Sequence, residues 1–397
     1  MPMDTFDALS AARELRQILN PDKLSLGFLI GAGCPSSIKV PDGSSTRPLI
    51  PDVAGLTKRI AAALSDSVDH KNTFTVLLDG LHEDGMASPN VEHYLTRVRS
   101  LHDVAGNSTA RGLSQKELMD LDKTICALIS EAVDCRLPST QSPFHDLASF
   151  IGARRTTHVE LFTTNYDLLI EEALENKGVP FFDGFCGSNR AFFDQRAIEG
   201  DLLPSRWARL RKLHGSINWR LLDKQVIRTR ETTSGAELLI HPSHRKYDDS
   251  RRMPYLVMMD RLRAFIRHKD NPVCLFINGY SWADEHLNEA IVDGLADNPK
   301  AVCLSIQRSE IAKYTALVAL ATRTPNLTIY AKDAAVVGQK TRQWTVRPTA
   351  DVTSLKGIFE AVSGAGDAPV PGTFLLGDFM AFGRFLSTFS SADVAAG

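Results

Sequence analysis

The stretch LFTTNYDLLIEEAL, residues 161–174, changes from an apolar strand pattern to a helical pattern within a few residues. Between the two parts stand Thr163, Thr164, Asn165, Tyr166 and Asp167. Asp167 can cap a helix that begins at residue 168, and the threonines can satisfy backbone groups. Asn165 is harder to explain in this way, because an amide that donates and accepts at once suits a water molecule or a sugar hydroxyl.

The same succession of strand, loop and helix recurs along the chain. The segment LSLGFLIGAGCPSS (24–37) is an apolar strand that runs into a glycine turn, and a helix that Pro51 and Asp52 can start follows it. Later strands are expected at 158–165, 209–215, 272–280, 301–306 and 326–332, with helices at 168–178 and 283–298 between them. This alternation predicts an α/β fold with a parallel sheet covered by helices.

Two regions depart from the alternation. Residues of about 61–155 have helical spacing, and Ser114 and Glu117 occupy capping-box positions, so we expect a helical subdomain inserted into the sheet. At the other end, 362–374 has the composition of a linker, and 374–389 is rich in aromatic residues that can dock on the body or on another subunit. We therefore expect a catalytic unit over 1–345 and a docking or oligomerisation segment over 346–397.

The hydrophobic content and the charge balance of the chain limit the classes of protein to which it can belong. The chain has 397 residues, 43% of them hydrophobic, which suffices for a large core. Its 45 Lys and Arg nearly balance its 47 Asp and Glu, so we expect no direct binding of nucleic acid or membrane. No apolar run approaches the roughly 18 residues that span a bilayer, and the N-terminus lacks a signal-peptide pattern. We expect a cytoplasmic protein.

The chain gives little sign of a metal site. Its six cysteines are scattered, with no two of them separated by two residues, and we expect buried free thiols. Asp284, Glu285 and His286 are consecutive and therefore point apart on a helix, where capping and a solvated face explain them. His241 and His244 are expected to lie in a turn.

Four loops are expected at the edge where the carboxyl ends of parallel strands meet, which is where open α/β sheets bind ligands. In the first, Gly31 to Ser36, missing side chains let the backbone approach a pyrophosphate, with free N–H groups facing its charge. The full dinucleotide fingerprint fails there, because serine stands at position 36 in place of the third glycine. The second loop contains Asn165.

The third and fourth loops carry an imidazole and a small polar stretch. His214 stands at a strand end, where it is either a structural hydrogen-bonding group or an acid–base catalyst. Gly279, Tyr280 and Ser281 precede Asp284, which is expected to cap the next helix.

Taken together and in this order, GAG, IPD, TTNYD, LHGS and GYSWADEHLN resemble the motifs of the sirtuin-like family of NAD-binding proteins. The set looks closest to the bacterial branch that consumes NAD in antiphage defence. The segments YAKDAAVVG and LGDFMAFGRFL resemble stand-alone members encoded beside a HerA-type hexameric ATPase. The resemblance implies a Rossmann-like sheet, NAD as substrate, a homo-oligomer and a HerA-type ATPase as partner.

The resemblance also implies roles for individual residues. Asn165 would order the catalytic water or the ribose, Asp167 would hold the carboxamide, and His214 would be the catalytic histidine. Pro35 stands where the family usually has serine, so Ser36 is expected to replace that contact. The implied cofactor-binding residues are Gly31, Ala32, Gly33 and Ser36 at the phosphates, Ile50, Pro51 and Asp52 at the nicotinamide ribose, Thr164 beside Asn165, and Gly279, Tyr280 and Ser281 on the adenosine side.

The cysteines bear on the choice of reaction. Sirtuin deacylases carry a zinc module with paired cysteine dyads, and this sequence has none, so hydrolysis of NAD to nicotinamide and ADP-ribose becomes the leading hypothesis. Nicotinamide leaves as a neutral molecule from an oxocarbenium-like transition state, which rewards correct orientation of the ribose. A deacylase or ADP-ribosyltransferase, a nicotinamide oxidoreductase and a non-catalytic NAD-sensing scaffold remain as alternatives. An enzyme that destroys NAD needs restraint, so we expect a latent form in which the helical insert or the oligomer limits access.

Overall fold

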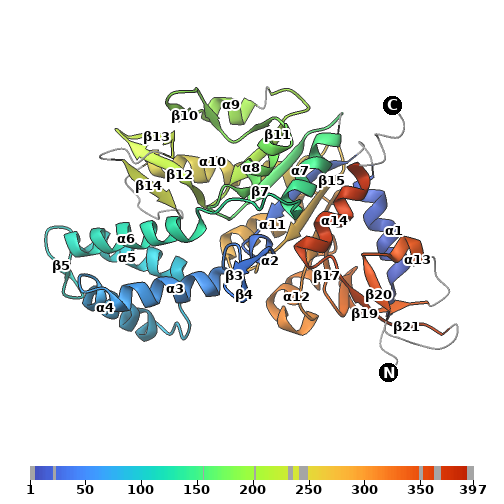
Figure 1. The fold of residues 1–397 in the computed structure, drawn as a ribbon, viewed down its shortest axis with the longest axis horizontal. Coiled ribbons are helices and arrows are strands. Elements are labelled where there is room, and N and C mark those ends of the chain that lie inside the picture. Colours follow the sequence, from blue (N-terminus) through green and yellow to red (C-terminus); the bar gives the residue numbers. More distant parts are fainter. Residues whose placement is uncertain are drawn as a thin grey trace.

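A twelve-stranded sheet runs through the molecule (Figure 1). The computed structural model describes residues 5–20, 24–154, 156–200, 203–230, 236–240, 249–347, 352–361 and 368–390. Seven neighbouring strands are parallel, in the order β8 (Phe181–Phe182), β11 (Ala208–Lys212), β7 (Val159–Thr163), β2 (Ser25–Ile30), β15 (Val273–Asn278), β16 (Ala301–Ile306) and β17 (Leu327–Tyr330). The predicted α/β class is confirmed.

The remaining strands extend one side of the sheet. They are β18 (Ala334–Val337), β19 (Lys340–Val346), β21 (Val370–Phe374) and β20 (Phe359–Ala361), all antiparallel, with β1 (Thr5–Asp7) parallel to β19. The expectation of a linker over 362–374 is wrong for 370–374, because these residues pair with β19 and β20. A proline and a glycine are tolerated there, since β21 lies near the edge of the sheet.

Helices cover both faces of the sheet because its strands alternate apolar residues between two cores. Phe28 packs against Phe150 and Phe382 on one face, whereas Phe162 packs against Phe265 on the other. The first face carries α1 (Ala8–Leu19), α7 (Pro143–Ala153), α8 (Leu169–Asn176) and α14 (Phe379–Ser390). The second carries α10 (Asp249–Ile266), α11 (Glu285–Asp297) and α12 (Thr315–Ala321). The aromatic helix α14 packs directly on α7.

A layer of helices stands beside the sheet, at the left of Figure 1. It consists of α3 (Val53–Asp66), α4 (Lys71–Glu83), α5 (Val91–Ala105) and α6 (Gln115–Val133), with the short hairpin of β5 (Thr109–Ala110) and β6 (Leu113–Ser114) at its tip. Asp52 caps α3, Asn90 caps α5, and Ser114 with Glu117 forms the expected capping box of α6. Helices form over much of the expected range 61–155, but the last of them, α7, covers the sheet and is not part of this layer. We call the layer α3–α6 the helical insert.

A second, antiparallel sheet follows β8, and the sequence analysis did not anticipate it. Its strands, in order, are β14 (Glu237–Ile240), β12 (Gly215–Leu222), β13 (Gln225–Arg228), β10 (Ala191–Phe193) and β9 (Phe185–Cys186). Trp219 is fully buried in it against Phe185. Most of these strands have two to four residues, too few for a reliable alternating pattern.

Smaller elements complete the fold. They are α2 (Gly33–Ser37), β3 (Lys39–Asp42), β4 (Ser45–Pro48), α9 (Gln195–Gly200), the 3₁₀ turn Ile311–Lys313 and α13 (Val352–Leu355). Among the helices of the described ranges, none is both long and apolar enough to cross a membrane.

Candidate active site

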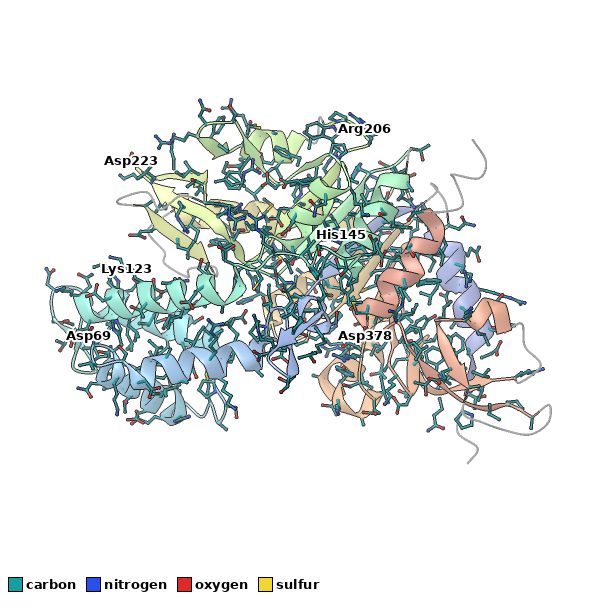
Figure 2. The ribbon with its side chains drawn as sticks, in the orientation of Figure 1. Asp69, Lys123, His145, Arg206, Asp223 and Asp378 are labelled. Carbon is teal, nitrogen blue, oxygen red and sulfur yellow. The ribbon has the colours of Figure 1, made fainter. Side chains whose placement is uncertain are left out.

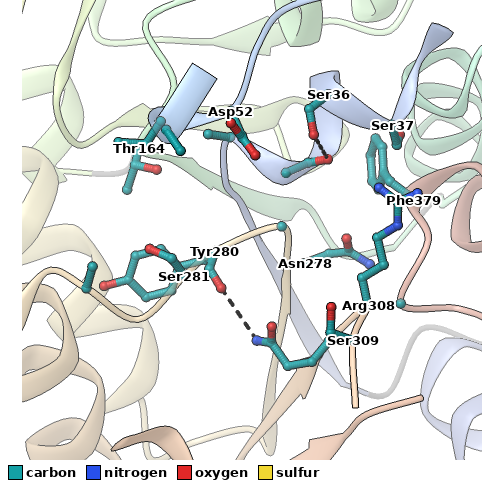
Figure 3. Close-up of a pocket in the computed structure, with 18 of the residues that line it drawn as sticks. Ser36, Ser37, Asp52, Thr164, Asn278, Tyr280, Ser281, Arg308, Ser309 and Phe379 are labelled. Atoms are coloured by element: carbon teal, nitrogen blue, oxygen red, sulfur yellow. Dashed lines mark hydrogen bonds between the residues drawn. The ribbon is translucent and has the colours of Figure 1, made fainter. Parts of the chain in front are cut away.

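A cavity of about 530 Å³ opens at the carboxyl ends of five adjacent strands, β16, β15, β2, β7 and β11 (Figure 3). This size is typical of small-molecule sites. Side chains and backbone from the strand-end loops, the helical insert and the start of α14 line it: Ala32, Gly33, Ser36, Ser37, Asp52, Val53, Ala54, Asn90, Glu92, Thr164, His214, Asn278, Gly279, Tyr280, Ser281, Ala283, Asp284, Ile306, Gln307, Arg308, Ser309, Tyr314, Gly377 and Phe379.

The residues singled out from the sequence divide into two groups. Those in the cavity wall are Ala32, Gly33, Ser36, Asp52, Thr164, His214, Gly279, Tyr280 and Ser281. Those outside the wall are Gly31, Ile50, Pro51, Asn165 and Asp167. Ile50 is buried, and Asp52 uses one carboxylate oxygen to accept a hydrogen bond from the Gly55 N–H at 2.8 Å, which starts α3. The helix cap thus fixes the Asp52 carboxylate at the rim.

The glycine loop after β2 is bonded to the loop after β15. The N–H groups of Gly31, Gly33 and Cys34 donate to the carbonyl oxygens of Asn278, Gly279 and Gly31, at 2.9–3.0 Å. A Cβ added to Gly31 would lie 2.4 Å from the carbonyl oxygen of Gly279. The expectation that these N–H groups are free for a pyrophosphate is therefore wrong, and close contact between the loops explains the two glycines of the GAG motif.

The two serine hydroxyls of this loop also form local hydrogen bonds. Ser36 Oγ donates to the Gly33 carbonyl oxygen at 3.0 Å, as the dashed line in Figure 3 shows. Ser37 Oγ donates to the Cys34 carbonyl oxygen at 2.7 Å. Both serines line the cavity while Pro35 is buried behind them, so either hydroxyl can turn toward a ligand only by giving up a local bond.

Asn165 and Asp167 lie behind the cavity wall, on the loop between β7 and α8. Asn165 Nδ2 donates to the Gly31 carbonyl oxygen at 3.3 Å, and its Oδ1 is buried with no hydrogen-bond partner among the described residues. Asp167 Oδ1 accepts from the Leu169 N–H at 3.0 Å, which is the bond of an Asx-turn. The expectation that Asp167 caps a helix beginning at 168 is wrong, because α8 begins at Leu169 and its cap position is Leu168. Burial raises the pKa of Asp167, and the nearby Lys212 opposes this shift.

Lys212, at the end of β11, holds the loop between β7 and α8 in place. Its ammonium is 1% exposed, donates to the backbone carbonyl of Asp167 and lies 3.0 Å from Glu171 Oε1. A buried lysine is stable when it is paired and hydrogen-bonded in this way. The loop that carries Asn165 is therefore held rigidly between β2 and β11.

His214 lies two residues after the end of β11 and is held between two carboxylates. Its Nε2 lies 3.0 Å from Asp284 Oδ2, and its Nδ1 lies 3.7 Å from Glu92 Oε1. Gly215 has φ +89°, a conformation that favours glycine, and its Cβ would meet the Leu239 carbonyl oxygen at 2.4 Å. The turn after His214 thus requires glycine, which fixes where the imidazole leaves the strand.

The paired carboxylates determine the charge of this imidazole. Burial alone would lower the pKa of His214, but the hydrogen bonds and charges of Asp284 and Glu92 outweigh it and raise the pKa to about 9. Burial would raise the pKa of Asp284, but His214 lowers it to about 2. At neutral pH His214 is therefore a cation, which donates its protons and must lose one before it can act as a base.

These two shifts predict how stability depends on pH. The unfolded pKa values are about 6.5 for histidine and about 3.9 for aspartate. The raised pKa of His214 gives stability that is complete below about pH 6.5 and lost as pH rises through about 9. The lowered pKa of Asp284 gives stability that is complete above about pH 4 and lost as pH falls through about 2.

We therefore expect the wild type to exceed Asp284→Asn in Tm by the largest margin between about pH 4 and 6.5. Asparagine is a good helix cap, so the variant keeps the start of α11. Thermal unfolding of both proteins between pH 5 and 9.5 measures the difference. A margin that stays constant over this range would mean that the ion pair does not stabilise the fold.

Asp284 was assigned to capping alone from the sequence, and this is incomplete. Its Oδ1 accepts from the Leu287 N–H at 3.1 Å while its Oδ2 pairs with His214. Its neighbours behave as expected, since His286 is 78% exposed. The sequence contained a clue to this second role, because Asp284 comes shortly after the 279–281 loop, which was predicted to line the site.

Three more groups of the cavity wall were missed. Arg308 and Ser309 follow β16, and Arg308 Nη2 lies 3.4 Å from Asp378 at the start of α14 (Figure 2). Their position after a predicted parallel strand was the signal that could have revealed them. Glu92 lies in the first turn of α5, and nothing in the spacing of the sequence connects it to His214.

Trp282 sits under the Tyr280–Ser281 loop with φ +60°, a rare conformation for a bulky residue. Its indole N–H donates to Ser305 Oγ at 2.9 Å, and its ring centroid is 5.6 Å from that of Tyr280. Tyr280 Oη donates to Asn288 Oδ1 at 2.8 Å. These bonds hold the loop in a strained conformation that points Ser281 into the cavity.

Within the described ranges, no group of three or more His, Cys, Asp or Glu side chains is arranged to hold a metal ion. The six cysteines are free, four of them buried. His241 and His244, expected in a turn, lie outside the described residues.

Residues 159–324 match the family model of the SIR2-like domain. This part of the chain is similar to the SIR2-like domain, and it makes up less than half of the 397 residues. The matched SIR2-like segment includes β7, Asn165, Asp167, His214 and the 279–281 loop, but neither the glycine loop of β2 nor the helical insert. Three of the four loops picked out from the sequence therefore lie within it.

Two solved structures of Sir2 proteins are also similar. One, described as a basis for the mechanism and regulation of Sir2 enzymes, has 12% identity and a TM-score of 0.34, covering 76% of this chain and 86% of that one. The other, a Sir2 homologue with a serine-to-alanine substitution in complex with ADP-ribose, has 11% identity and a TM-score of 0.34, covering 74% and 84%. Similarity this low establishes neither a shared activity nor a shared site. Among curated protein sequences, none matches this chain.

Proposed function

We propose that this chain is an NAD glycohydrolase that cleaves NAD to nicotinamide and ADP-ribose. One observation carries the proposal: His214 and the 279–281 loop of the SIR2-like segment open into the same 530 Å³ cavity as Ala32 and Gly33. A histidine, a carboxylate partner and a row of small polar residues around one cavity suit a sugar and its phosphates.

In the proposed reaction, the bond between the ribose anomeric carbon and the nicotinamide nitrogen breaks, and its electron pair stays on the neutral nicotinamide. Water attacks the anomeric carbon and loses one proton. His214, once neutral, accepts a proton from this water or from a ribose hydroxyl, and Asp284 stabilises the imidazolium that forms. The resemblance of the motifs assigns Asn165 to orienting the water or ribose and Asp167 to holding the carboxamide, and in this structure both would act from behind the cavity wall.

The opposite end of the cavity suits the phosphates. Arg308 is a half-exposed cation on its wall, with Ser309 next to it (Figure 3), and Gly33 also lines the cavity. Arginine matches phosphate oxygens with two parallel N–H donors. Since the Gly31, Gly33 and Cys34 amides are already bonded, we propose that Arg308 supplies much of the charge that the pyrophosphate needs.

The wall next to His214 favours water over an acyl-lysine side chain. Asn90 and Glu92 of the helical insert line the cavity there. A long aliphatic side chain placed against an amide and a carboxylate would desolvate polar groups without pairing them. Hydrolysis is therefore favoured over deacylation, which is the runner-up together with ADP-ribosyl transfer.

The proposal is tested by incubating the purified chain with NAD and separating nicotinamide and ADP-ribose by chromatography. The assay is repeated with an acyl-lysine peptide, and with a HerA-type ATPase together with DNA and ATP. Release of both products without peptide supports a hydrolase. Nicotinamide that appears only with peptide indicates a deacylase, and reduced cofactor indicates an oxidoreductase.

Asn165 provides a more local prediction. We expect Asn165→Ala to lower NAD turnover by about 10²-fold, because a misplaced water or ribose costs this much. We expect its free energy of unfolding to change by less than about 1 kcal/mol, because the substitution removes an unpartnered buried oxygen along with one hydrogen bond. Initial rates and chemical denaturation measure the two quantities. The control is Asn107→Ala, an exposed residue of the insert, and equal rates for the two variants would remove Asn165 from the mechanism.

We further propose, from the resemblance of the motifs, that NAD consumption serves antiphage defence in the cytoplasm. In this proposal the chain forms a homo-oligomer and works with a HerA-type hexameric ATPase. Mass photometry of the chain alone and with the ATPase measures both assemblies. Cellular NAD after phage infection, compared between wild type and His214→Ala, tests the defence role.

A non-catalytic NAD-sensing protein is the second candidate. The observation in its favour is the cationic His214, held on both ring nitrogens by carboxylates. An imidazolium in this state has both ring nitrogens occupied by carboxylates and accepts no proton. NAD binding without product under every condition above would favour this role.

A further inference from the structure

The helical insert reaches the candidate catalytic histidine through one side chain. Glu92, in the first turn of α5, places Oε1 3.7 Å from His214 Nδ1. The same oxygen accepts a hydrogen bond from Tyr166 Oη at 3.4 Å. Glu92 belongs to the insert, whereas His214 and Tyr166 belong to the SIR2-like segment, so one carboxylate links the two parts inside the cavity wall.

The two carboxylates of His214 differ in how firmly they are held. Asp284 caps α11 with one oxygen and lies 3.0 Å from His214 with the other. Glu92 lies 3.7 Å away, close to the limit of an ion pair, and its side chain is 29% exposed. A movement of α5 by a fraction of a helical turn would break the second contact and leave the first intact.

The helix that carries Glu92 is attached at identifiable points. Arg99 Nε donates to Asp122 Oδ1 at 2.8 Å within the insert, and Arg99 Nη2 donates to the Ile240 carbonyl oxygen of β14 at 3.2 Å. Near the site, the Val91 N–H donates to Thr57 Oγ1 of α3 at 3.1 Å. These contacts tie α5 to α3, α6 and the small sheet, so a change in the position of the insert moves Glu92.

We propose that Glu92 is a positioning residue through which the helical insert restrains His214. With α5 docked as in this structure, Glu92 holds the imidazole and its Nδ1 proton. When α5 is displaced, the proton is released to solvent and the neutral imidazole can accept a proton during NAD hydrolysis. The inference rests on the proposed function and names the contact by which that activity is kept low.

The charges around His214 support this assignment. The carboxylates that face His214 are Asp284 from α11 and Glu92 from α5. The hydroxyls nearby are those of Tyr280, which donates to the Asp284 carbonyl oxygen, Tyr166, which donates to Glu92, and Tyr255, which lies beside Gly215. Burial raises the pKa values of Tyr166 and Tyr280, so both stay neutral. Glu92 is then the charge next to His214 that the insert controls, and each unit that it adds to the histidine pKa lowers the neutral fraction at pH 7 about tenfold.

The test uses Glu92→Gln, which removes the charge and keeps the length of the side chain. NMR of ¹³Cε1-labelled histidines gives the pKa of His214 without NAD, with the resonance assigned by its absence in His214→Ala. We expect the pKa to fall by about one unit, the acidic limb of the kcat profile to move down equally, and kcat at pH 7 to rise about tenfold. Glu131→Gln, on α6 with a 70% exposed side chain paired to Arg59, is the control and should match the wild type.

A second variant separates this role from a structural one. Glu92 also favours the N-terminus of α5 by its charge, and Glu92→Asp preserves that effect while shortening the side chain. We expect Glu92→Asp to behave like Glu92→Gln if contact with His214 matters. Wild-type values in Glu92→Asp but not in Glu92→Gln would reduce the role of Glu92 to helix stability and overturn the proposal.

The outcomes distinguish the two proposals. A lowered pKa of His214 in Glu92→Gln, with no NAD hydrolysis by any protein, would refute the hydrolase function and leave the electrostatic link standing. Hydrolysis by wild type with an unchanged pKa and pH profile in Glu92→Gln would refute the restraint and leave the hydrolase function standing.

Discussion

Replacing His214 with alanine is expected to lower NAD turnover by about 10²–10⁴-fold, the usual contribution of a positioned acid–base group. His214 is the one titratable side chain of the SIR2-like motifs that both lines the cavity and contacts two carboxylates. Without it, a proton must go directly to water. Because the imidazole does not hold the adenosine or the phosphates in this proposal, the Kd for NAD should change only a few-fold.

Single-turnover rates and calorimetric titration of NAD separate these two quantities. The matched control is His286→Ala, in the first turn of α11 close to Asp284 but with a 78% exposed side chain. His214→Ala also leaves Asp284 and Glu92 facing one empty space, so its fold is checked by circular dichroism. A folded His214→Ala protein that retains wild-type turnover would exclude His214 from the reaction.

The second large effect is expected from Gly31→Ala. The added Cβ would lie 2.4 Å from the Gly279 carbonyl oxygen and 2.7 Å from Tyr280 Cα, and both neighbours are backbone. The loops after β2 and β15 must then separate, at a cost of about 3 kcal/mol of unfolding free energy. Denaturant titration measures the loss, and NAD binding should weaken with it because Gly33 and Tyr280 line the cavity.

Gly80→Ala is the matched control for this prediction. Gly80 lies inside α4, and its Cβ would meet only the ends of flexible arginine side chains, Arg111 Nη1 being nearest at 3.0 Å. An alanine within a helix is favoured over glycine by up to about 1 kcal/mol. Gly80→Ala should therefore be as stable as the wild type or more stable. Equal stability of Gly31→Ala and wild type would mean that the two loops are not closely packed.

The sequence correctly predicted which loops meet at the carboxyl edge of the sheet, and the reason is physical. Parallel strands connected by helices bring their carboxyl ends together, so residues after β2, β7, β11 and β15 had to meet. His214, Thr164 and the 279–281 loop do line one cavity. The pattern also gave the caps of α3 and α6, because capping depends on neighbours within four residues.

Contacts between segments far apart in sequence could not be predicted in this way. Glu92 and His214 are brought together by the packing of the insert, which no local periodicity encodes. The GAG motif was expected to expose its amides, but an amide that already donates to a carbonyl in another loop looks the same in sequence. The contact of Asp284 with His214 was missed because capping uses only one of the two carboxylate oxygens, and the other oxygen pairs with the imidazole.

The fluorescence of Trp282 can report on changes in the candidate site. Its indole is 5% exposed, donates to Ser305 and lies between the cavity loop and the end of β16. Indole emission depends on the polarity and hydrogen bonding of its surroundings, so a ligand that rearranges the Tyr280–Ser281 loop will change it. Trp219 and Trp344 are fully buried elsewhere and Trp207 is half-buried outside the cavity wall. Stopped-flow fluorescence can therefore follow occupancy of the cavity in the unlabelled protein, with these three tryptophans as background.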